Sequence, residues 1–597
     1  MSNLLSQASL VMIPSGYKED IVYCPVPTNG NGDLSFTRAS NGTRINSAGL
    51  VEVCPWNLLQ YSEDFSNGAW SKINATVTSN TTTAPNGTTT ADTLEKLGGS
   101  GGVNYYYIVQ NTNSFEQLTN FFYVKHKSGS GIVWILGLNS GTFAFFDVIN
   151  GTALSKSSGM TTSIESVGNG WYKCIVSQNY QGASSTTYGI GLCLVDGTPN
   201  YDATSAATQS VYIWGAQSSV SSTAKPYFPT TDRLNVPRLT YQNGGGGCPS
   251  LLLEKQSTND LLYSEQFDNA GWSKEAATST ANQTTSPDGT QNADTIVDNS
   301  TSGRHIFYQQ FTGNLATSRT FSLYAKQNSL RYLFMSVTNA GDADCYSAIF
   351  DLQSGTVSAT KVNGDGTISA SIVNAGNGWY RCIISGTMRT GNNSYFPLIG
   401  TSDRAGFTGS LFANNAPLYS GSGQSLFIYG AQLEESSYPT SYIPTTSSSA
   451  TRLVDYPSRS GLALTNSTFA VNFKPLDYVV ELFDFVKTGG GRMFYIAVQS
   501  NGFITFNSVS GGTIGAIGSV LPKKQTCKLA FSLNASTSNV KVYINGSIIG
   551  TYATNITTFG AFLGLQSFGY VPGTQIEQIA IFPSVLTDAE CQALTTI

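Results

Sequence analysis

Hydrophobic and polar residues alternate over short stretches of this chain, and turn residues separate the stretches. In one of them, Asn169-Gly170 precedes the run Trp171-Tyr172-Lys173-Cys174-Ile175. Asn-Gly is a strong hairpin signal, and the alternation that follows it is that of a strand with one buried face. Similar runs lie at 469–473, 493–498, 528–532 and 540–544. The pattern predicts an all-β chain of short strands assembled into sandwiches.

Only the end of the chain has the pattern of a helix. Thr587 precedes residues 588–594, and Glu590 stands three positions after it. This spacing is that of a capping box, in which each of the two side chains satisfies a backbone N–H of the first turn. We therefore expect a short C-terminal helix.

Many of the strand-like stretches occur twice. Tyr61-Ser62-Glu63 returns as Tyr263-Ser264-Glu265, an offset of 202 (263 minus 61), and 168–175 returns as 376–383. The offset grows along the repeat, as loop insertions would cause. The duplication predicts two jelly-roll β-sandwich modules, at 55–235 and 257–448. It leaves an N-terminal arm at 1–54, a linker or wide turn at 236–256, and a separate domain at 458–597.

Composition narrows the classes of function. The chain has 597 residues, more than one core can hold, and only 11% are charged, where about 25% is usual. The net charge is −5 and no basic run occurs, which argues against nucleic-acid binding. No apolar run is long enough to insert in a membrane, and the N-terminus lacks the cationic start of a signal peptide. We expect synthesis in a cytoplasm.

Several segments resemble known families. Residues 542–546, 563–564, 576–582 and 586–590 resemble the second half of a laminin-G-like, concanavalin A-like lectin domain. The two repeated modules resemble jelly rolls of the carbohydrate-binding-module type. Residues 35–40, 46–52, 58–65 and 248–254 are similar to stretches of tailed-bacteriophage virion proteins of the fibre type, with the crAss-like group as one candidate.

The resemblance implies a structural component of a bacteriophage virion, a head or tail fibre or appendage, that displays glycan-binding modules for host attachment. The implied partners are host-surface glycans and other virion proteins contacted through the arm at 1–54. Fibre proteins are commonly trimers, so the resemblance also implies a homo-oligomer. The implied location is the virion, after synthesis in the host bacterial cytoplasm. Two alternatives stay open: the modules are spacers, or the arm is an edge strand folded back on the first module.

Catalytic patterns are weak. Glu481 and Asp484 form the best local carboxylate pair, but strict strand alternation places them on opposite faces, where they could not flank one glycosidic bond. The segment also departs from the Glu-x-Asp-x-x-Glu pattern of concanavalin A-like glucanases. His126 and His305 have no partnered nucleophile. We expect no catalytic residues and no enzyme activity. The alternative is a glycan-degrading depolymerase or glycosidase with accessory binding modules.

Metal and cofactor patterns are absent as well. No Cys-x-x-Cys pair occurs among the nine cysteines, and Cys174 and Cys382 are predicted to be small buried hydrophobes. Asp147 and Asp351 have oxygen ligands of the kind calcium takes, but no Asp-x-Asp-x-Asp loop surrounds them. Turn capping is the predicted role of both, and no cofactor is expected.

Aromatic residues provide the candidate ligand-binding groups. Four tryptophans occupy repeated positions and are predicted to be core residues: Trp70, Trp171, Trp272 and Trp379. Tyr105, Tyr106 and Tyr107 lie outside the repeat pattern, and successive strand residues face opposite sides, so at least one of them should be exposed. We predict that these tyrosines stack against a glycan, and that any recognition specific to one module lies where the two copies differ.

Overall fold

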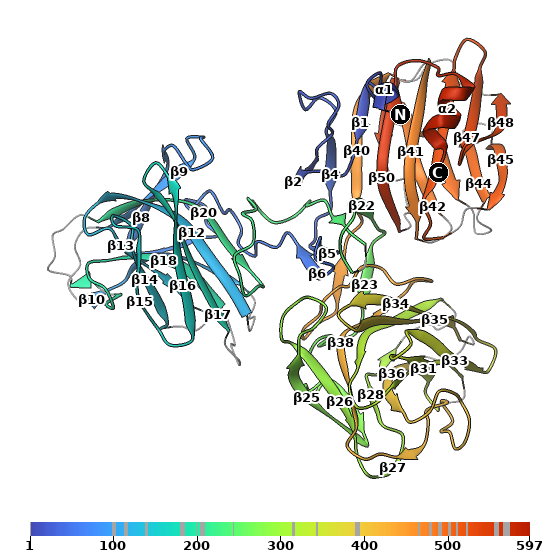
Figure 1. Cartoon of the computed structure of the whole chain (residues 1–597), viewed down its shortest axis with the longest axis horizontal. Helices are drawn as coiled ribbons and strands as arrows, with labels where there is room; N and C mark the ends of the chain where they lie inside the picture. The colour runs from blue at the N-terminus through green and yellow to red at the C-terminus, as the bar shows by residue number, and fades with distance from the viewer. Residues whose placement is uncertain are drawn as a thin grey trace. The chain divides into compact units, whose positions relative to one another are not determined.

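The computed structural model is built almost entirely of antiparallel strands (Figure 1). It describes the chain except residues 1, 98–102, 113–116, 138–140, 180–185, 200, 203–208, 243, 313–316, 342–343, 389–393, 464–465, 477–479, 488–491, 499–502, 509–511, 521–522, 554–559 and 565–572. The chain divides into two compact units, one of Pro55–Leu234 and one of Met1–Cys54 with Asn235–Ile597. The predicted all-β sandwich class is confirmed.

The unit Pro55–Leu234, called the first sandwich below, has two six-stranded sheets. In spatial order the first sheet holds β15 (Thr152–Lys156), β14 (Phe143–Asp147), β13 (Ile132–Leu136), β18 (Thr186–Cys193), β11 (Tyr106–Thr112) and β7 (Ser71–Ile73). The second holds β16 (Met160–Gly168), β17 (Trp171–Asn179), β12 (Gln117–Ser128), β20 (Ser210–Ser219), β9 (Ala91–Lys96) and β8 (Ala75–Thr82). The short strands β10 (Val103–Asn104) and β19 (Tyr201–Asp202) pair separately.

Residues 257–448 form a second sandwich with the same strand order. Its first sheet holds β33 (Thr356–Asn363), β32 (Cys345–Asp351), β31 (Tyr332–Asn339), β36 (Ser394–Ser402), β28 (Ile306–Tyr308) and β24 (Ser273–Glu275), with β29 (Phe311–Thr312) also on β36. Its second holds β34 (Thr367–Gly376), β35 (Trp379–Thr387), β30 (Arg319–Gln327), β38 (Ser425–Glu434), β26 (Ala293–Asp298) and β25 (Ala277–Thr284). Two short pairs join β27 (Ser302–Gly303) to β37 (Tyr419–Ser420) and β23 (Ser257–Asn259) to β39 (Ala450–Arg452).

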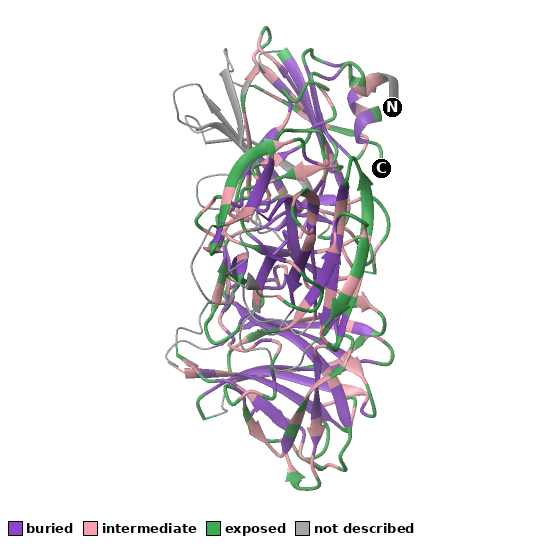
Figure 2. Cartoon of the chain, turned by 90° about the vertical axis from the view of Figure 1, so that its left-hand side faces the viewer, coloured by how far each residue is buried: buried purple, intermediate pink, exposed green. Residues whose placement is uncertain are grey.

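The repeated landmarks build equivalent cores. All four repeated tryptophans are 1–2% exposed, which confirms their predicted core role. The indole of Trp70 donates to the Tyr61 carbonyl, and that of Trp272 to the Tyr263 carbonyl, each at 3.0 Å. Buried residues lie along the strands, and exposed ones gather at loops and edges (Figure 2).

The C-terminal sandwich recruits strands from three regions of the sequence. One sheet holds β21 (Leu239–Thr240), β22 (Ser250–Leu253), β50 (Thr574–Phe582), β41 (Asn466–Pro475), β46 (Cys527–Asn534), β47 (Asn539–Ile544) and β48 (Ser547–Ala553), with β1 (Leu10–Met12) also on β50. The other holds β2 (Tyr17–Lys18), β3 (Ile21–Val22), β4 (Leu34–Thr37), β40 (Tyr456–Ala463), β49 (Gly560–Gly564), β42 (Val480–Lys487), β43 (Arg492–Val498), β44 (Phe503–Ser508) and β45 (Gly512–Val520).

The arm and the segment 236–256 therefore differ from the separate N-terminal arm and the linker or wide turn expected above. Leu10 and Met12 of the arm, and Leu251 and Leu253 of the expected linker, are buried in the core of the C-terminal sandwich. The arm's first strand pairs with β50 and not with the first sandwich. Local sequence patterns could not name the distant strand with which each of these segments would pair.

The hairpin of β5 (Gly42–Ile45) and β6 (Val51–Cys54) attaches the arm to the second sandwich. The amide of Val51 donates to the Pro287 carbonyl at 2.9 Å, and the hydroxyl of Thr43 donates to the Tyr442 carbonyl at 2.5 Å. Val51 also packs in a cluster with Trp379 and Tyr442. The hairpin thus buries an aromatic surface of the second sandwich.

Several local predictions are confirmed. Besides the short α1 (Ser2–Leu5), a helix α2 (Asp588–Thr595) is capped by Thr587, whose side chain forms the expected capping box with Glu590. Asp147 accepts from the amides of Ile149 and Asn150, which is a turn-capping role. In the described residues no helix is long and apolar enough to span a membrane.

Candidate functional site

The three predicted tyrosines lie at the start of β11, and the strand separates them as alternation requires. Tyr106 is 2% exposed and packs in the core between the two sheets. It is therefore corrected from ligand candidate to core residue. Tyr107 faces the outer side of the sheet and is partly exposed, and Tyr105, just before the strand, is 39% exposed.

An aromatic cluster covers the outer side of this sheet. It comprises Tyr105, Tyr107, Trp134 of β13, and Phe143 and Phe145 of β14, and is called the aromatic face below. The Tyr105 ring stacks on Phe143, with centroids 6.2 Å apart and planes at 17°. The Trp134 and Phe143 rings meet edge-on, with centroids 5.1 Å apart. The Trp134 and Tyr107 rings are tilted relative to each other, with centroids 5.4 Å apart. Trp134 and Phe143 were not predicted as site residues, because the strands that carry them are distant from Tyr105 in sequence.

Gly191 on β18 makes room for the largest ring of the aromatic face. A Cβ atom at this position would lie 2.1 Å from the Trp134 ring, so any side chain would displace the indole. The indole N–H donates to the Pro199 carbonyl at 3.1 Å, and Trp134 is only 1% exposed. Trp134 is thus the buried base of the face, and Tyr105 is its outermost ring.

The second sandwich has a different surface at the equivalent place. In the first sandwich, Gly191 pairs with both Tyr107 and the β13 residue Trp134. In the second, Gly400 pairs with both Ile306 and the β31 residue Phe334. Tyr107 and Ile306 are therefore equivalent. Counting back two residues places Arg304 where the first sandwich has Tyr105. The guanidinium of Arg304 lies 3.9 Å from the centroid of the Phe412 ring.

The chain itself covers that second face. Ala416 packs with Phe334 and Ile349 on the outer side of the sheet, and the side-chain amide of Asn415 donates to the Ser347 hydroxyl at 3.4 Å. Arg304 also pairs with Glu275 at 2.9 Å. The two modules therefore differ at this face: one presents an exposed tyrosine, and the other carries an arginine tied to its own chain.

The histidine, cysteine and aspartate side chains considered above for chemistry have structural roles instead. His305 is 1% exposed, and its ring nitrogens lie 2.6 Å from the Ala276 carbonyl and 3.1 Å from the Tyr419 carbonyl. Cys174 and Cys382 are buried free thiols, as predicted. Asp351 caps a turn and pairs with Arg331 at 2.5 Å, which holds the pKa of its carboxyl well below the ordinary range. In the part of the chain that the structure describes, no cluster of three His, Cys, Asp or Glu residues could hold a metal ion.

The carboxylates considered for hydrolysis lie on β42, and their side chains fall outside the described residues. The backbone register shifts between Glu481 and Phe483, which marks a bulge or irregularity. The strict alternation assumed from the sequence therefore does not run through this pair.

No known protein family matches the chain, and no curated protein matches it. Among solved structures, it is similar to a Ruminococcus gnavus sialidase CBM40 bound to α2,3-sialyllactose, at 18% identity and TM-score 0.20, over 23% of this chain and 84% of that one. It is similar to a tandem CBM22 of Paenibacillus barcinonensis Xyn10C at 13% identity and TM-score 0.19, over 63% and 96%. It is also similar to the LG1-3 region of laminin α2 at 10% identity and TM-score 0.17, over 81% and 96%. At such scores these likenesses carry no functional argument.

Proposed function

We propose that this protein binds glycans through the aromatic face of the first sandwich. The observation that carries the proposal is the exposed ring of Tyr105, stacked on Phe143 above the buried Trp134. Ligand sites are predominantly apolar and aromatic, with a few polar groups that fix orientation. A sugar ring presents a face of C–H groups that can pack against such an aromatic ring.

The tyrosine is held in place before any ligand arrives. Its carbonyl accepts a hydrogen bond from the side-chain amide of Asn74 at 3.0 Å, and its ring meets Tyr107, Trp134 and Phe143. A fixed aromatic ring loses little conformational entropy when it binds, which favours affinity. The equivalent Arg304 is engaged with Phe412 and Glu275, so the second sandwich offers no such platform at this position.

A glycan array carrying bacterial surface polysaccharides, followed by calorimetry on a positive glycan, tests this function. Tyr105→Ala should weaken binding by about tenfold, since one aromatic stacking contact is worth roughly 1.4 kcal/mol. Arg304→Ala, at the equivalent position of the second sandwich, is the matched control and should leave the affinity unchanged. An array with no positive glycan, or equal affinities for Tyr105→Ala and wild type, would contradict the proposal.

The proposal includes the setting that the sequence resemblance implies: a virion appendage that attaches to host-surface glycans without cleaving them. Its support is the resemblance of 35–40, 46–52, 58–65 and 248–254 to phage virion proteins. Mass spectrometry of purified particles should find the chain at a fixed copy number. Incubation with a bound polysaccharide should release no new reducing ends. Release of reducing ends would favour the depolymerase alternative.

A further inference from the structure

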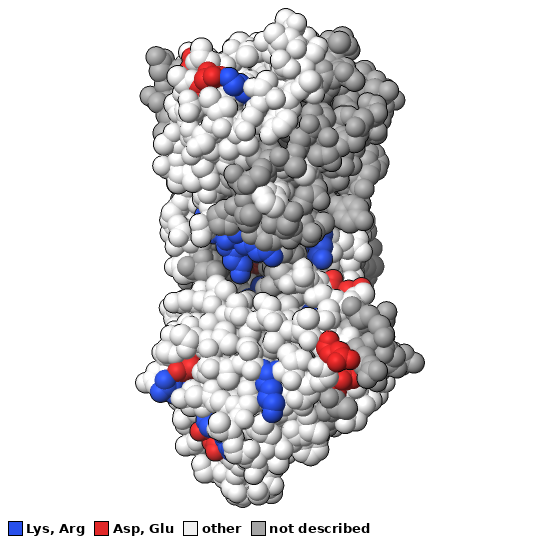
Figure 3. All heavy atoms as spheres, turned by 90° about the vertical axis from the view of Figure 1, so that its right-hand side faces the viewer, with Lys and Arg blue, Asp and Glu red and all other residues white. Residues whose placement is uncertain are grey.

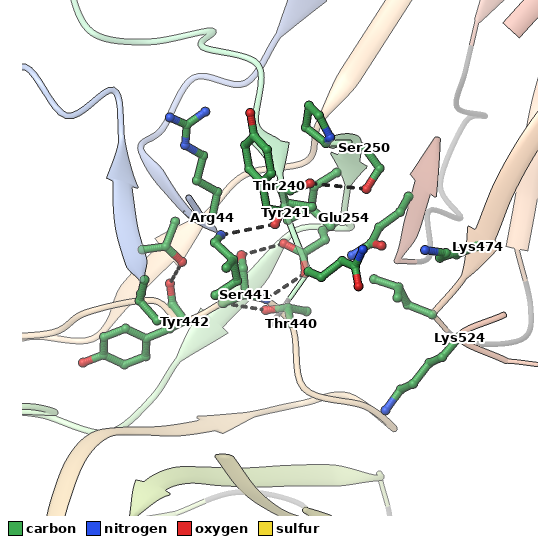
Figure 4. A pocket seen from close by; sticks show the side chains of 18 of the residues that line it. Arg44, Thr240, Tyr241, Ser250, Glu254, Thr440, Ser441, Tyr442, Lys474 and Lys524 are labelled. Carbon is green, nitrogen blue, oxygen red and sulfur yellow. Dashed lines mark hydrogen bonds between the residues drawn. The ribbon is translucent and has the colours of Figure 1, made fainter. Parts of the chain in front are cut away.

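A cavity lies in the unit that holds the arm, the second sandwich and the C-terminal sandwich. Its volume is about 840 Å³, within the range of cavities that take small ligands. Lys474 and Lys524 line it from the C-terminal sandwich, Arg381 and Thr440 from the second sandwich, and Thr240 and Ser250 from the segment between the modules. Figure 4 shows Lys474 and Lys524 extending into the cavity from one side, opposite Thr440 and Ser441.

Basic groups outnumber the acidic groups that could neutralise them there. The Lys474 ammonium pairs with Glu577 at 2.9 Å. Among the described residues, neither Lys524 nor Arg381 has a carboxylate within ion-pair distance. Arg381 donates instead to the Thr440 carbonyl at 2.8 Å and the Ser322 hydroxyl at 2.9 Å. These neutral acceptors orient the guanidinium and leave its charge uncompensated.

The other acidic side chain of the lining is already engaged. Glu254 pairs with the buried Arg238 at 2.8 Å and accepts from the Ser441 hydroxyl at 2.6 Å. Arg44, the other arginine named in the lining, pairs with Glu52 at 2.9 Å. The uncompensated positive charge of the cavity therefore comes from Lys524 and Arg381.

This local excess stands out on a chain whose net charge is −5. Figure 3 shows Lys and Arg atoms gathered around a hollow at mid-height of the face it presents. Burial, and then the positive charges of Arg381 and Lys523, lower the pKa of Lys524. Like charges held this close repel one another, and a bound anion would relieve the repulsion.

We propose that this cavity binds an acidic sugar, with the anionic group, a carboxylate or a phosphate, placed between Lys524 and Arg381. Two features favour a sugar over a long polyanion. The cavity is confined to about 840 Å³, and its lining mixes hydroxyl and amide groups, such as Thr240 and Gln575, with apolar surface from Ile13 and Leu476. The site is separate from the aromatic face, so either can fail without the other.

Calorimetry of the full chain tests the site with three probes: trigalacturonate, the neutral trimer of galactose, and glucose 6-phosphate. We expect at least tenfold tighter binding of an acidic probe than of the neutral one, weakening as salt rises. The acidic probe that binds identifies the source of the anion, carboxylate or phosphate. Lys524→Glu should weaken binding of that probe at least tenfold, whereas Tyr105→Ala should not change it.

Lys361→Glu on β33 is the matched control for charge reversal outside the cavity, and its affinity should stay within twofold of wild type. Lys524 has a left-handed backbone, with φ of 61°. Lys524→Asn is therefore the second variant, because asparagine tolerates this conformation, and it too should weaken binding. Equal binding of acidic and neutral probes, or an unchanged affinity in folded Lys524→Glu and Lys524→Asn, would overturn the proposal.

Discussion

At the residue scale, Glu265 shows how one side chain can bring a pH response to a chain with few charges. Its carboxylate accepts from the Tyr429 hydroxyl at 2.9 Å. Burial, with a further contribution from the negative charge of Asp288, raises the pKa of Glu265 to about 7. The equivalent Glu63 accepts from Tyr227 at 3.1 Å, and burial raises its pKa as well.

Glu265 should make the second sandwich less stable as the pH rises. The folded state keeps the proton up to about pH 7, whereas an unfolded glutamate releases it near 4.5. The stabilisation is therefore complete below pH 4.5 and is lost as the pH passes 7, a change of about 3 kcal/mol. Thermal unfolding of Glu265→Gln from pH 5 to 8 should show a smaller decline than wild type.

Glu435→Gln is the control for this pH dependence, because that side chain is 60% exposed. Its unfolding temperature should follow the wild-type pH profile. Equal slopes in wild type and Glu265→Gln would show that Glu265 titrates at its ordinary pKa in the folded protein.

At the element scale, the N-terminal strand belongs to the C-terminal sandwich. Leu10, Val11 and Met12 of β1 are 0–3% exposed and align with residues 579–581 of β50. The amide of Ser9 also donates to the Ile581 carbonyl at 2.8 Å. These contacts join the two ends of the sequence and engage the apolar start of the arm within the chain itself.

Met12→Ala should destabilise the C-terminal sandwich by about 2–5 kcal/mol, because it leaves a cavity in a packed core. Ile13→Ala changes the next residue, which is 42% exposed, and should cost less than about 1 kcal/mol. Chemical denaturation followed by intrinsic fluorescence measures both. Equal, small losses would mean that β1 is not docked in solution.

At the scale of the whole molecule, a buried charge cluster joins segments that are far apart in sequence. Asp455 pairs with Arg38 of the arm at 2.7 Å and also with Arg238. Arg238 in turn pairs with Glu254 at 2.8 Å, and Arg452 lies 3.6 Å from both acids. All five side chains are at most 2% exposed. Their mutual attraction offsets the cost of removing them from water only while every partner is present.

Asp455→Asn should destabilise the unit by about 3–5 kcal/mol, because it leaves three buried arginines without their shared carboxylate. Asp403→Asn, which removes a 42% exposed partner of Arg404, should cost less than about 1 kcal/mol. Differential scanning calorimetry would compare the two. Similar melting temperatures for both variants would mean that the cluster adds nothing to stability.

The sequence by itself determined the structural features that depend on residues close together in the chain or repeated along it. Alternation and Asn-Gly turns indicated the strands, the landmarks repeated in the same order revealed the duplication, and repetition marked Trp70 and Trp272 as core. The capping box of Thr587 and Glu590 was equally readable, because it lies within one helical turn. Strand alternation also implied that the three predicted tyrosines would be divided between the core and the surface.

Only the tertiary structure decided which strands pair. The docking of β1 and β22 on β50, the meeting of Tyr105 with Phe143 and Trp134, and the convergence of Lys524 with Arg381 all join residues far apart in the chain. Period-two alternation says that a strand has a buried face but not which partner buries it, and strand pairing is non-local. Both proposed sites therefore became visible only after the strands were assembled.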